Sequence, residues 1–314
     1  MKQKNPRSDL ATRVALLYYS DNLSQNDIAL TLGISRSYVS QLLTLARELG
    51  IVQITVNAGE AYLAEESFAR RYQLQQAFIL PSTSQEYTDS EFGKYCAPHT
   101  LRLIRNVKRI GINLGASVNK VVSMIQKEDV GDCTVELVVQ IMGGCVQQEK
   151  TKAGSMPSEL VFRMGQLLNC DTLYLNCPAL ITNATARELL LQEASIQNVI
   201  AAWDHLDMVL MGMGQAGAGM LFGNFPELRA RIRASRAVAD VNLNFLDRSG
   251  ALLPVLVENR MAMAFEDIRK VKTKVAYAYG TPKAKAILAA MRAKMIDVLF
   301  TDSLTMDEIL KLDK

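Results

Sequence analysis

Polar side chains gather near the start of a helix predicted over residues 35–47. One face of this helix would be buried, because four apolar residues recur at helical spacing: Val39, Leu42, Leu43 and Ala46. The residues predicted to face outward or to lie near the helix start carry hydroxyl, amide or guanidinium groups: Ser35, Arg36, Ser37, Tyr38, Ser40, Gln41 and Arg47. Such groups hydrogen-bond to base edges and phosphates, so this surface is predicted to read double-stranded operator DNA.

The preceding residues supply the support that such a helix needs. Ser24 can cap a first helix that buries Ile28, and Gly33 permits the positive φ that ends it. Ser35 can then cap the second helix. The stretch SQNDIALTLGISRSYVSQLL (24–43) is therefore typical of a helix-turn-helix DNA reader. An ordinary pair of helices joined by a turn is the alternative.

Charge favours more than one copy of this surface. The 314-residue chain has a net charge of only +3, and residues 1–58 hold six basic and four acidic residues, a net of +2. Affinity for DNA rises with the number of phosphate contacts, so a single copy would bind weakly. We therefore expect a homodimer or a homotetramer on a symmetric operator.

Composition excludes several classes of protein. Hydrophobic residues make up 49% of the chain, yet no run reaches the roughly 18 apolar residues of a membrane helix. The start, MKQKNPRSDL, lacks the apolar core of a signal peptide. Five cysteines without a CxxC pair favour free thiols in a reducing compartment. We expect a cytoplasmic protein with no membrane association, no cofactor and no structural metal.

The chain changes character twice after the DNA-reading segment. Residues 51–56 alternate like a short strand, as at the edge of a winged module, so 1–57 is predicted to be a winged helix-turn-helix domain. Residues 58–74 are helical in pattern and predicted to link the domains. Residues 75–314 form the third part, predicted to bind an effector and to oligomerise.

This third part alternates short apolar runs with helical stretches. Strands are predicted over 77–80, 109–114, 136–142, 172–176, 208–213, 274–279 and 296–300. Helices are predicted over 117–127, 158–169, 184–202, 225–235 and 282–294. Apolar strands separated by helices indicate a mostly parallel sheet covered on both faces. The fold class is α/β, a Rossmann-like sheet domain behind the helix-turn-helix.

Ligands of such sheets bind outside the carboxyl ends of the strands, which directs attention to three glycine-bearing loops. Gly115, Ala116 and Ser117 begin a helix, where backbone N–H groups and a hydroxyl suit a phosphate or a sugar hydroxyl. Gly143-Gly144 and Gly214 follow two other apolar strands and permit close backbone approach. A plain strand-to-helix turn with a serine cap is the alternative for the first loop, and an ordinary tight turn is the alternative for Gly143-Gly144. None matches a dinucleotide or ATP motif.

Two charged residues occupy unexpected places. Asp240 lies in an otherwise apolar stretch, where it serves either a backbone hydrogen bond or a ligand's hydroxyls. Lys283 lies in the first turn of a predicted helix, where a cation opposes the helix dipole unless an anion is bound. A solvated surface lysine is the alternative.

The chain resembles the SorC family of bacterial sugar-responsive transcriptional regulators. The resemblance covers nearly the whole chain. It is carried by ALLYYSDNLSQNDIALTLGISRSYVSQLL, GIVQITV, IGINLGASV, VVQIMGG, WDHLDMVLMGMG, VADVNLNFLDRSG and GTPKAKAILAAM, in that order. It implies an N-terminal winged helix-turn-helix joined to a Rossmann-like domain related to sugar-phosphate isomerases.

The resemblance also implies roles for particular residues. Gly115, Ala116 and Ser117 match a strand-to-helix loop that binds the effector, Asp240 matches an acidic residue that holds sugar hydroxyls, and Lys283 matches a helix-start lysine near the effector. The expected protein is a regulator of a carbohydrate-utilisation operon, controlled by a sugar or sugar-phosphate effector. We do not expect an enzyme.

Two alternatives remain at this point. The first is a sugar-phosphate isomerase-like enzyme fused to a DNA-binding head, although only Asp240 is placed as an acid–base group. The second is a domain that has lost its effector and only oligomerises.

Overall fold

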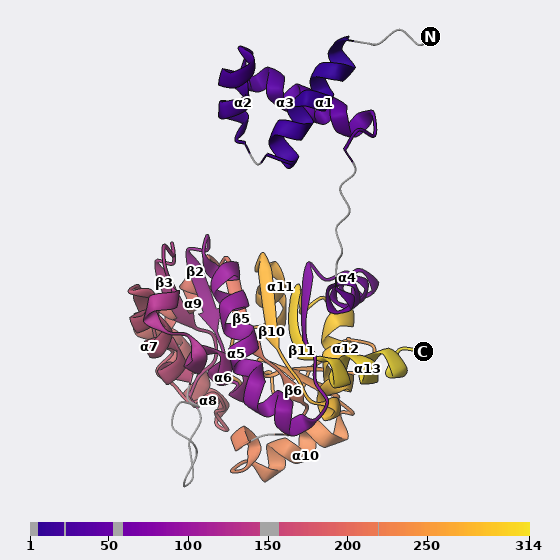
Figure 1. Cartoon of the computed structure of the whole chain (residues 1–314). Coiled ribbons are helices and arrows are strands. Elements are labelled where there is room, and N and C mark those ends of the chain that lie inside the picture. The colour runs from indigo at the N-terminus through magenta and orange to yellow at the C-terminus, as the bar shows by residue number, and fades with distance from the viewer. Residues whose placement is uncertain (1–5, 22, 53–58, 145–156, 219) are drawn as a thin grey trace. The chain divides into compact units, whose positions relative to one another are not determined.

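The computed structural model describes residues 6–21, 23–52, 59–144, 157–218 and 220–314 (Figure 1). The chain divides into two compact units, Met1–Gly59 and Glu60–Lys314. Among the described helices, none combines the length and apolar character needed to cross a membrane.

The first unit contains three helices around a small core. They are α1 (Pro6–Tyr19), α2 (Gln25–Leu32) and α3 (Arg36–Glu48). The α3 side chains predicted to be buried contact Ala11 and Val14 of α1 and Ile28 of α2. Residues 51–52 form a bend instead of the predicted strand, and the rest of that prediction falls on residues 53–56, outside the described ranges.

The turn between α2 and α3 has the predicted local structure. Ser24 caps α2 by accepting a hydrogen bond from the Asp27 N–H at 3.2 Å. Gly33 ends α2 with a φ of 65°, a conformation that glycine adopts without a steric penalty. Ser35 caps α3 by accepting from the Tyr38 N–H at 3.2 Å. The serine–glycine–serine spacing therefore fixes both helix boundaries.

The second unit is built on a seven-stranded parallel sheet. Its strands, in spatial order, are β1 (Gln76–Leu80), β11 (Val298–Asp302), β10 (Thr273–Tyr277), β5 (Met208–Gly212), β2 (Arg109–Ile112), β3 (Leu137–Gln140) and β4 (Asp171–Leu173). All seven predicted strands are present, with ends that differ from the predicted ones by at most three residues. The predicted α/β fold class is confirmed.

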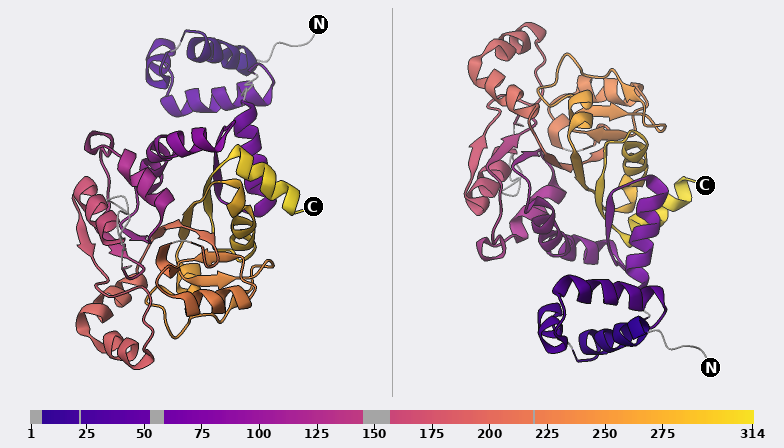
Figure 2. Two further views of the ribbon diagram at one scale, coloured as in Figure 1. Left: turned by 90° about the horizontal axis from the view of Figure 1, so that it is seen from below. Right: turned by 90° about the horizontal axis from the view of Figure 1, so that it is seen from above.

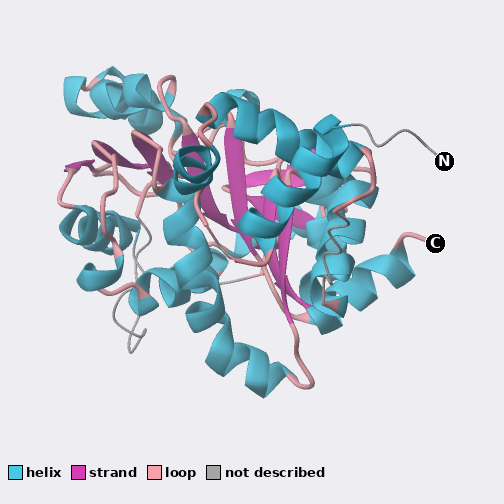
Figure 3. Cartoon of the chain, turned by 45° about the horizontal axis from the view of Figure 1, so that its top comes forward, coloured by secondary structure: helices cyan, strands magenta, loops and turns pink. Residues whose placement is uncertain are grey.

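Helices cover both faces of this sheet (Figure 3). Successive side chains of each strand point to opposite sides, so each face of the sheet contributes to a core of its own. On β5, Val209 and Met211 enter one core and Met208 and Leu210 enter the other. The first core receives side chains from α4 (Glu60–Tyr72), α8 (Ala184–Gln192), α9 (Ala194–Trp203), α11 (Phe265–Lys270), α12 (Ala284–Arg292) and α13 (Ser303–Leu312). The second receives them from α5 (Gln85–Ile104), α6 (Ala116–Met124) and α7 (Pro157–Leu168).

Two helical predictions need comment. The single helix predicted over 184–202 is wrong, because the chain breaks into α8 and α9 at Glu193, whose backbone is extended. The predicted linker helix corresponds to α4, and its residues Phe68 and Ala69 pack into the core of the second unit.

A smaller antiparallel sheet adjoins the large one and was not predicted. It contains β6 (Gly214–Gln215), β7 (Ala239–Val241), β8 (Asn244–Leu246) and β9 (Leu252–Leu253), with α10 (Pro226–Ala234) nearby. These elements share a separate core that includes Phe222, Ile232 and Phe245. Short 3₁₀ turns complete the unit at Lys127–Asp129, Met220–Phe222 and Thr281–Lys283. The elements around α10 and α12 are visible in orange and yellow in Figure 2.

Candidate functional site

The exposed face of α3 carries the side chains predicted to contact DNA. Arg36, Ser37, Ser40 and Gln41 are exposed, whereas the neighbouring Val39 is fully buried. Within the described part of the chain, the one side-chain hydrogen bond of these four residues joins Ser37 Oγ to Ser35 Oγ at 3.0 Å. The face is therefore polar and open to a partner.

The other three predicted DNA contacts have partial structural roles. The Ser35 hydroxyl caps α3, and Tyr38 is half-buried against the core of the first unit. Arg47 is exposed near the end of α3 and donates to Thr44 Oγ1 at 3.4 Å. Among the seven predicted DNA contacts, the side chains most accessible to a partner are therefore those of Arg36, Ser37, Ser40 and Gln41.

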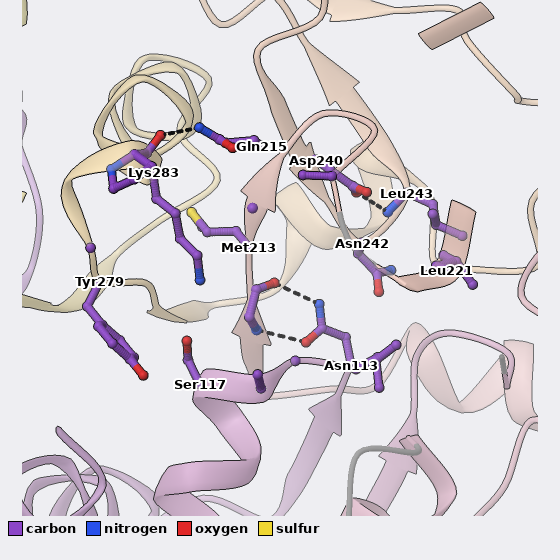
Figure 4. Close-up of a pocket in the computed structure, with 18 of the residues that line it drawn as sticks. Asn113, Ser117, Met213, Gln215, Leu221, Asp240, Asn242, Leu243, Tyr279 and Lys283 are labelled. Carbon is purple, nitrogen blue, oxygen red and sulfur yellow. Dashed lines mark hydrogen bonds between the residues drawn. The ribbon is translucent and has the colours of Figure 1, made fainter. Parts of the chain in front are cut away.

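A cavity of about 700 Å³ lies in the second unit, at the carboxyl ends of the strands (Figure 4). Its floor is formed by the residues that follow β2 and β5. From β2 the chain proceeds to β3 and β4 on one side, whereas β5 is followed by β10 and β11 on the other. The cavity therefore occupies the point where the strand order reverses, which is the usual ligand site of open parallel sheets.

Asn113 joins the two strands beneath this cavity. Its side chain is 2% exposed, donates to the Gly212 carbonyl at 3.0 Å and accepts from the Gly212 N–H at 2.8 Å. Next to this pair, a Cβ added to Gly115 would lie 2.9 Å from the Gly212 Cα. Gly115 is thus required for close packing of this loop against Gly212.

We expect Asn113→Ala to lower the free energy of unfolding by about 2–4 kcal/mol, because the Gly212 N–H and carbonyl would both lose buried partners. Thermal unfolding of the full chain measures this loss. Asn119→Ala is the control. Asn119 lies on α6 and is half-exposed, so this variant should change stability little. Equal losses in the two variants would contradict the role given to Asn113.

One end of the cavity is suited to an anion. α6 begins at Gly115 without a side-chain cap, so its first N–H groups are available. Among the described residues, the Ser117 hydroxyl has no hydrogen-bond partner, and the Lys283 ammonium has neither a hydrogen bond nor an ion pair, although it lies over the Tyr279 ring. Figure 4 shows the Lys283 ammonium directed toward Ser117.

Tyr279 and Asp89 adjoin the Lys283 ammonium. The Lys283 Nζ lies 5.7 Å from the centre of the Tyr279 ring, and the Tyr279 hydroxyl donates to Asp89 at 2.8 Å. Burial lowers the pKa of Lys283, and Lys120 acts in the same direction, against the opposing attraction of Asp89. An anion that enters the cavity would stabilise the charged form of Lys283, which burial otherwise disfavours.

The opposite end of the cavity is formed by the turn between β7 and β8. Asp240 is half-buried there, and its Oδ1 accepts from the Leu243 N–H at 2.8 Å. Burial raises the pKa of the Asp240 carboxyl to about 7, although the Leu243 N–H and Arg260 oppose the change. A carboxyl group in this condition can both accept and donate hydrogen bonds near neutral pH.

We expect Asp240→Asn to raise the melting temperature by a few degrees at pH 8 and by progressively less toward pH 4. The folded carboxyl holds its proton up to about pH 7 and the unfolded one only to about pH 4, so wild-type stability falls as the pH rises through this interval. Thermal unfolding across the interval measures the difference. A gain that is the same at every pH would contradict this assignment.

Most residues predicted to bind an effector line this one cavity. They are Gly115, Ala116, Ser117, Gly214, Asp240 and Lys283. Gly143 and Gly144 are not among the described residues lining it. A Cβ on Gly143 would lie 2.7 Å from the Cys177 carbonyl oxygen, and Gly144 exchanges backbone hydrogen bonds with Cys177 and Ala179. The glycine pair thus serves close backbone packing.

Six polar residues of the lining were not predicted from the sequence: Gln85, Asp89, Asn113, Gln215, Asn242 and Tyr279. An apolar wall that includes Met142, Met213 and Leu221 was not predicted either. The one local sequence signal for this part of the lining is the pair Asn242 and Asn244, which flank Leu243. Asparagine tolerates the positive φ of tight turns, and Asn242 adopts it.

Comparison with known proteins covers almost the entire chain. Residues 56–311 match the sugar-binding family profile Sugar-bind, described as "Putative sugar-binding domain". The sequence is 26% identical over 311 residues to the sorbitol operon regulator of Klebsiella pneumoniae, covering 96% of this chain and 98% of that protein. It is 25% identical over 312 residues to the deoxyribonucleoside regulator of Bacillus subtilis (strain 168), covering 95% and 96%.

A solved structure agrees with these matches. The crystal structure of the full-length sorbitol operon regulator SorC from Klebsiella pneumoniae aligns with a TM-score of 0.73 and 25% identity, over 96% of this chain and 98% of that one. These relatives are named as regulators and not as enzymes. The chain belongs to the SorC family of sugar-responsive transcriptional regulators.

Proposed function

We propose that this protein regulates a carbohydrate-utilisation operon by binding operator DNA through α3 and a sugar or sugar-phosphate effector in the cavity of the second unit. The carrying observation is that one chain combines a polar, open recognition helix with a cavity whose two ends are polar. Residues 1–57 serve as the DNA-binding domain, 58–74 as the link and 75–314 as the effector-binding and oligomerisation domain. We propose a cytoplasmic homodimer or homotetramer.

The lining of the cavity suits an effector that carries an anionic group at one end and hydroxyl groups at the other. Lys283, Ser117 and the start of α6 suit a phosphate or another anion, and Asp240 suits hydroxyl groups. The regulator names of the relatives support control of transcription over catalysis. Effector binding would change the DNA affinity by a coupling free energy of about 1–3 kcal/mol.

Fluorescence anisotropy on DNA from upstream of the protein's own gene tests this proposal. The full-length protein is titrated with and without a panel of sugars and sugar phosphates. Tight binding that one compound shifts supports the whole proposal. Tight binding that no compound shifts contradicts the effector part, and no specific binding at moderate salt contradicts the DNA part.

Arg36→Ala is expected to weaken operator binding by about tenfold or more, because an exposed guanidinium at the start of α3 can contact a base or a phosphate. The same anisotropy titration measures the loss. Arg7→Ala, in α1, provides a control at an exposed arginine outside the recognition helix. An Arg36 variant with wild-type affinity would contradict the placement of α3 against DNA.

A further inference from the structure

A carboxylate lies at the end of the cavity that is suited to an anion. Asp89 lines the cavity there together with Tyr279 and Lys283, and Figure 4 shows the last two on the same side. Among the described lining residues, Lys283 is the only cation. The other acidic residue of the lining, Asp240, belongs to the opposite end. The net charge that an entering anion meets therefore depends on the partners of Asp89.

Close packing of α5 against α6 places Lys120 beside Asp89. Gly93 lies on α5 one turn after Asp89, and a Cβ added to it would lie 2.6 Å from the Lys120 carbonyl oxygen. The Lys120 Nζ donates to the Asp89 backbone carbonyl at 2.7 Å and to the Asp89 carboxylate at 3.0 Å. The charge of Lys120 is therefore paired, and the ammonium is held by two acceptors of one residue.

The same carboxylate engages the Tyr279 hydroxyl, which donates to it at 2.8 Å. The ammonium groups of Lys120 and Lys283 lie 5.4 Å and 5.7 Å from the centre of the Tyr279 ring. Burial acts to raise the pKa of the Asp89 carboxyl, but hydrogen bonds from Tyr279 and Lys120 lower it overall, so the group is charged at neutral pH. Asp89 thus occupies two donors that an anion in the cavity could otherwise use.

We propose that Asp89 is a specificity-determining residue that limits the charge of the effector: one anionic group is accepted beside Lys283, and a second anionic group next to it is disfavoured. The inference rests on the proposed function and concerns the charge of its effector. The charges of Lys120, Lys283 and Asp89 sum to +1, which a single anionic group is sufficient to neutralise. A second group, as in a diphosphate, would approach the Asp89 carboxylate, and like charges repel.

Isothermal titration of the full-length protein with inorganic phosphate and with pyrophosphate, at constant pH and ionic strength, tests the proposal. The wild type should bind pyrophosphate no more tightly than phosphate, despite its larger charge. Asp89→Asn frees the Lys120 charge, so it should tighten pyrophosphate binding by about tenfold and phosphate binding by about threefold. Because the Lys120 and Asp89 side chains are 37% and 52% exposed, both gains should shrink at high salt. Damage to the fold would instead weaken the binding of both anions.

Glu91→Gln is the matched control, because it removes one negative charge from the same helix. Glu91 pairs with Lys94 at 2.9 Å and is not among the described residues lining the cavity, so both affinities should stay within about twofold of the wild type. Lys120→Met tests the opposite sign. It leaves the Asp89 carboxylate without its counter-ion and should weaken both anions, pyrophosphate more than phosphate. The double variant of Asp89→Asn and Lys120→Met should return toward the wild-type preference.

Several outcomes would overturn the proposal. They are a wild type that prefers pyrophosphate, an Asp89→Asn variant whose preference between the two anions is unchanged, and an equal gain in Glu91→Gln. If Asp89→Asn does not fold, Lys120→Met decides, and an unchanged preference in that variant also overturns the proposal. Failure of both anions to bind any variant overturns it and also removes the anionic group from the proposed effector. Operator binding is measured separately by anisotropy, so failure of this inference is distinguishable from failure of the proposed function.

Discussion

Replacing Lys283 with methionine is expected to weaken binding of an anionic effector by about tenfold to a hundredfold, because a charge-assisted hydrogen bond in a sheltered site is lost. Methionine preserves most of the side-chain volume but removes the charge, and with it the cation–π contact with Tyr279. The operator affinity of the effector-free protein should not change. Calorimetry gives the first quantity, and anisotropy with and without effector gives the second.

Lys285→Met is the matched control. Lys285 lies two residues further along the chain, in the first turn of α12, and is exposed, so the variant should behave like the wild type in both assays. Loss of operator affinity in effector-free Lys283→Met would mean that the residue supports the fold. An unchanged effector affinity would remove Lys283 from the site.

Leu42→Ala is expected to destabilise the first unit by about 2–5 kcal/mol, the usual cost of truncating a fully buried leucine. A unit of this size has little stability to lose, so the helix-turn-helix should be largely unfolded at 37 °C. Operator binding should then be lost while calorimetric effector binding persists. Differential scanning calorimetry and anisotropy measure the two effects.

Leu30→Ala provides the comparison for the same substitution on the surface. Leu30 is 83% exposed on α2, and its truncation should change the melting temperature very little. If the two leucine variants were equally stable, the core that joins α1, α2 and α3 would be placed incorrectly.

Sequence patterns were sufficient for most of the fold because the signals were local. β2, β3 and β5 are buried on both faces, so their sequences are nearly continuous apolar runs that could be recognised locally. The long helix α5 was not identified, because it contains Gly93 and Pro98, which normally interrupt helices. The small antiparallel sheet was missed because its strands have only two or three residues each.

The candidate site was only partly predictable, since its remaining members depend on contacts between distant segments. Ser117, Asp240 and Lys283 could be singled out by type and position. Asn113 is defined by a partner 99 residues away, Gly212. Asn242 depends on carbonyls of two separate segments, and no spacing rule in a single sequence encodes such pairings.

One face of the small antiparallel sheet packs in the core that includes Phe222 and Phe245, whereas Ala239, Val241 and Leu246 pack in a core of the large sheet. Its β7–β8 turn contributes Asp240, Asn242 and Leu243 to the cavity, whereas the opposite end comes from elements anchored in the parallel sheet. Substitutions at this turn would therefore alter one end of the cavity and leave the other end unchanged. Because β7 and β8 also pack in a core of the large sheet, libraries confined to the turn, and not extended to the whole small sheet, would be the most direct route to a changed effector preference.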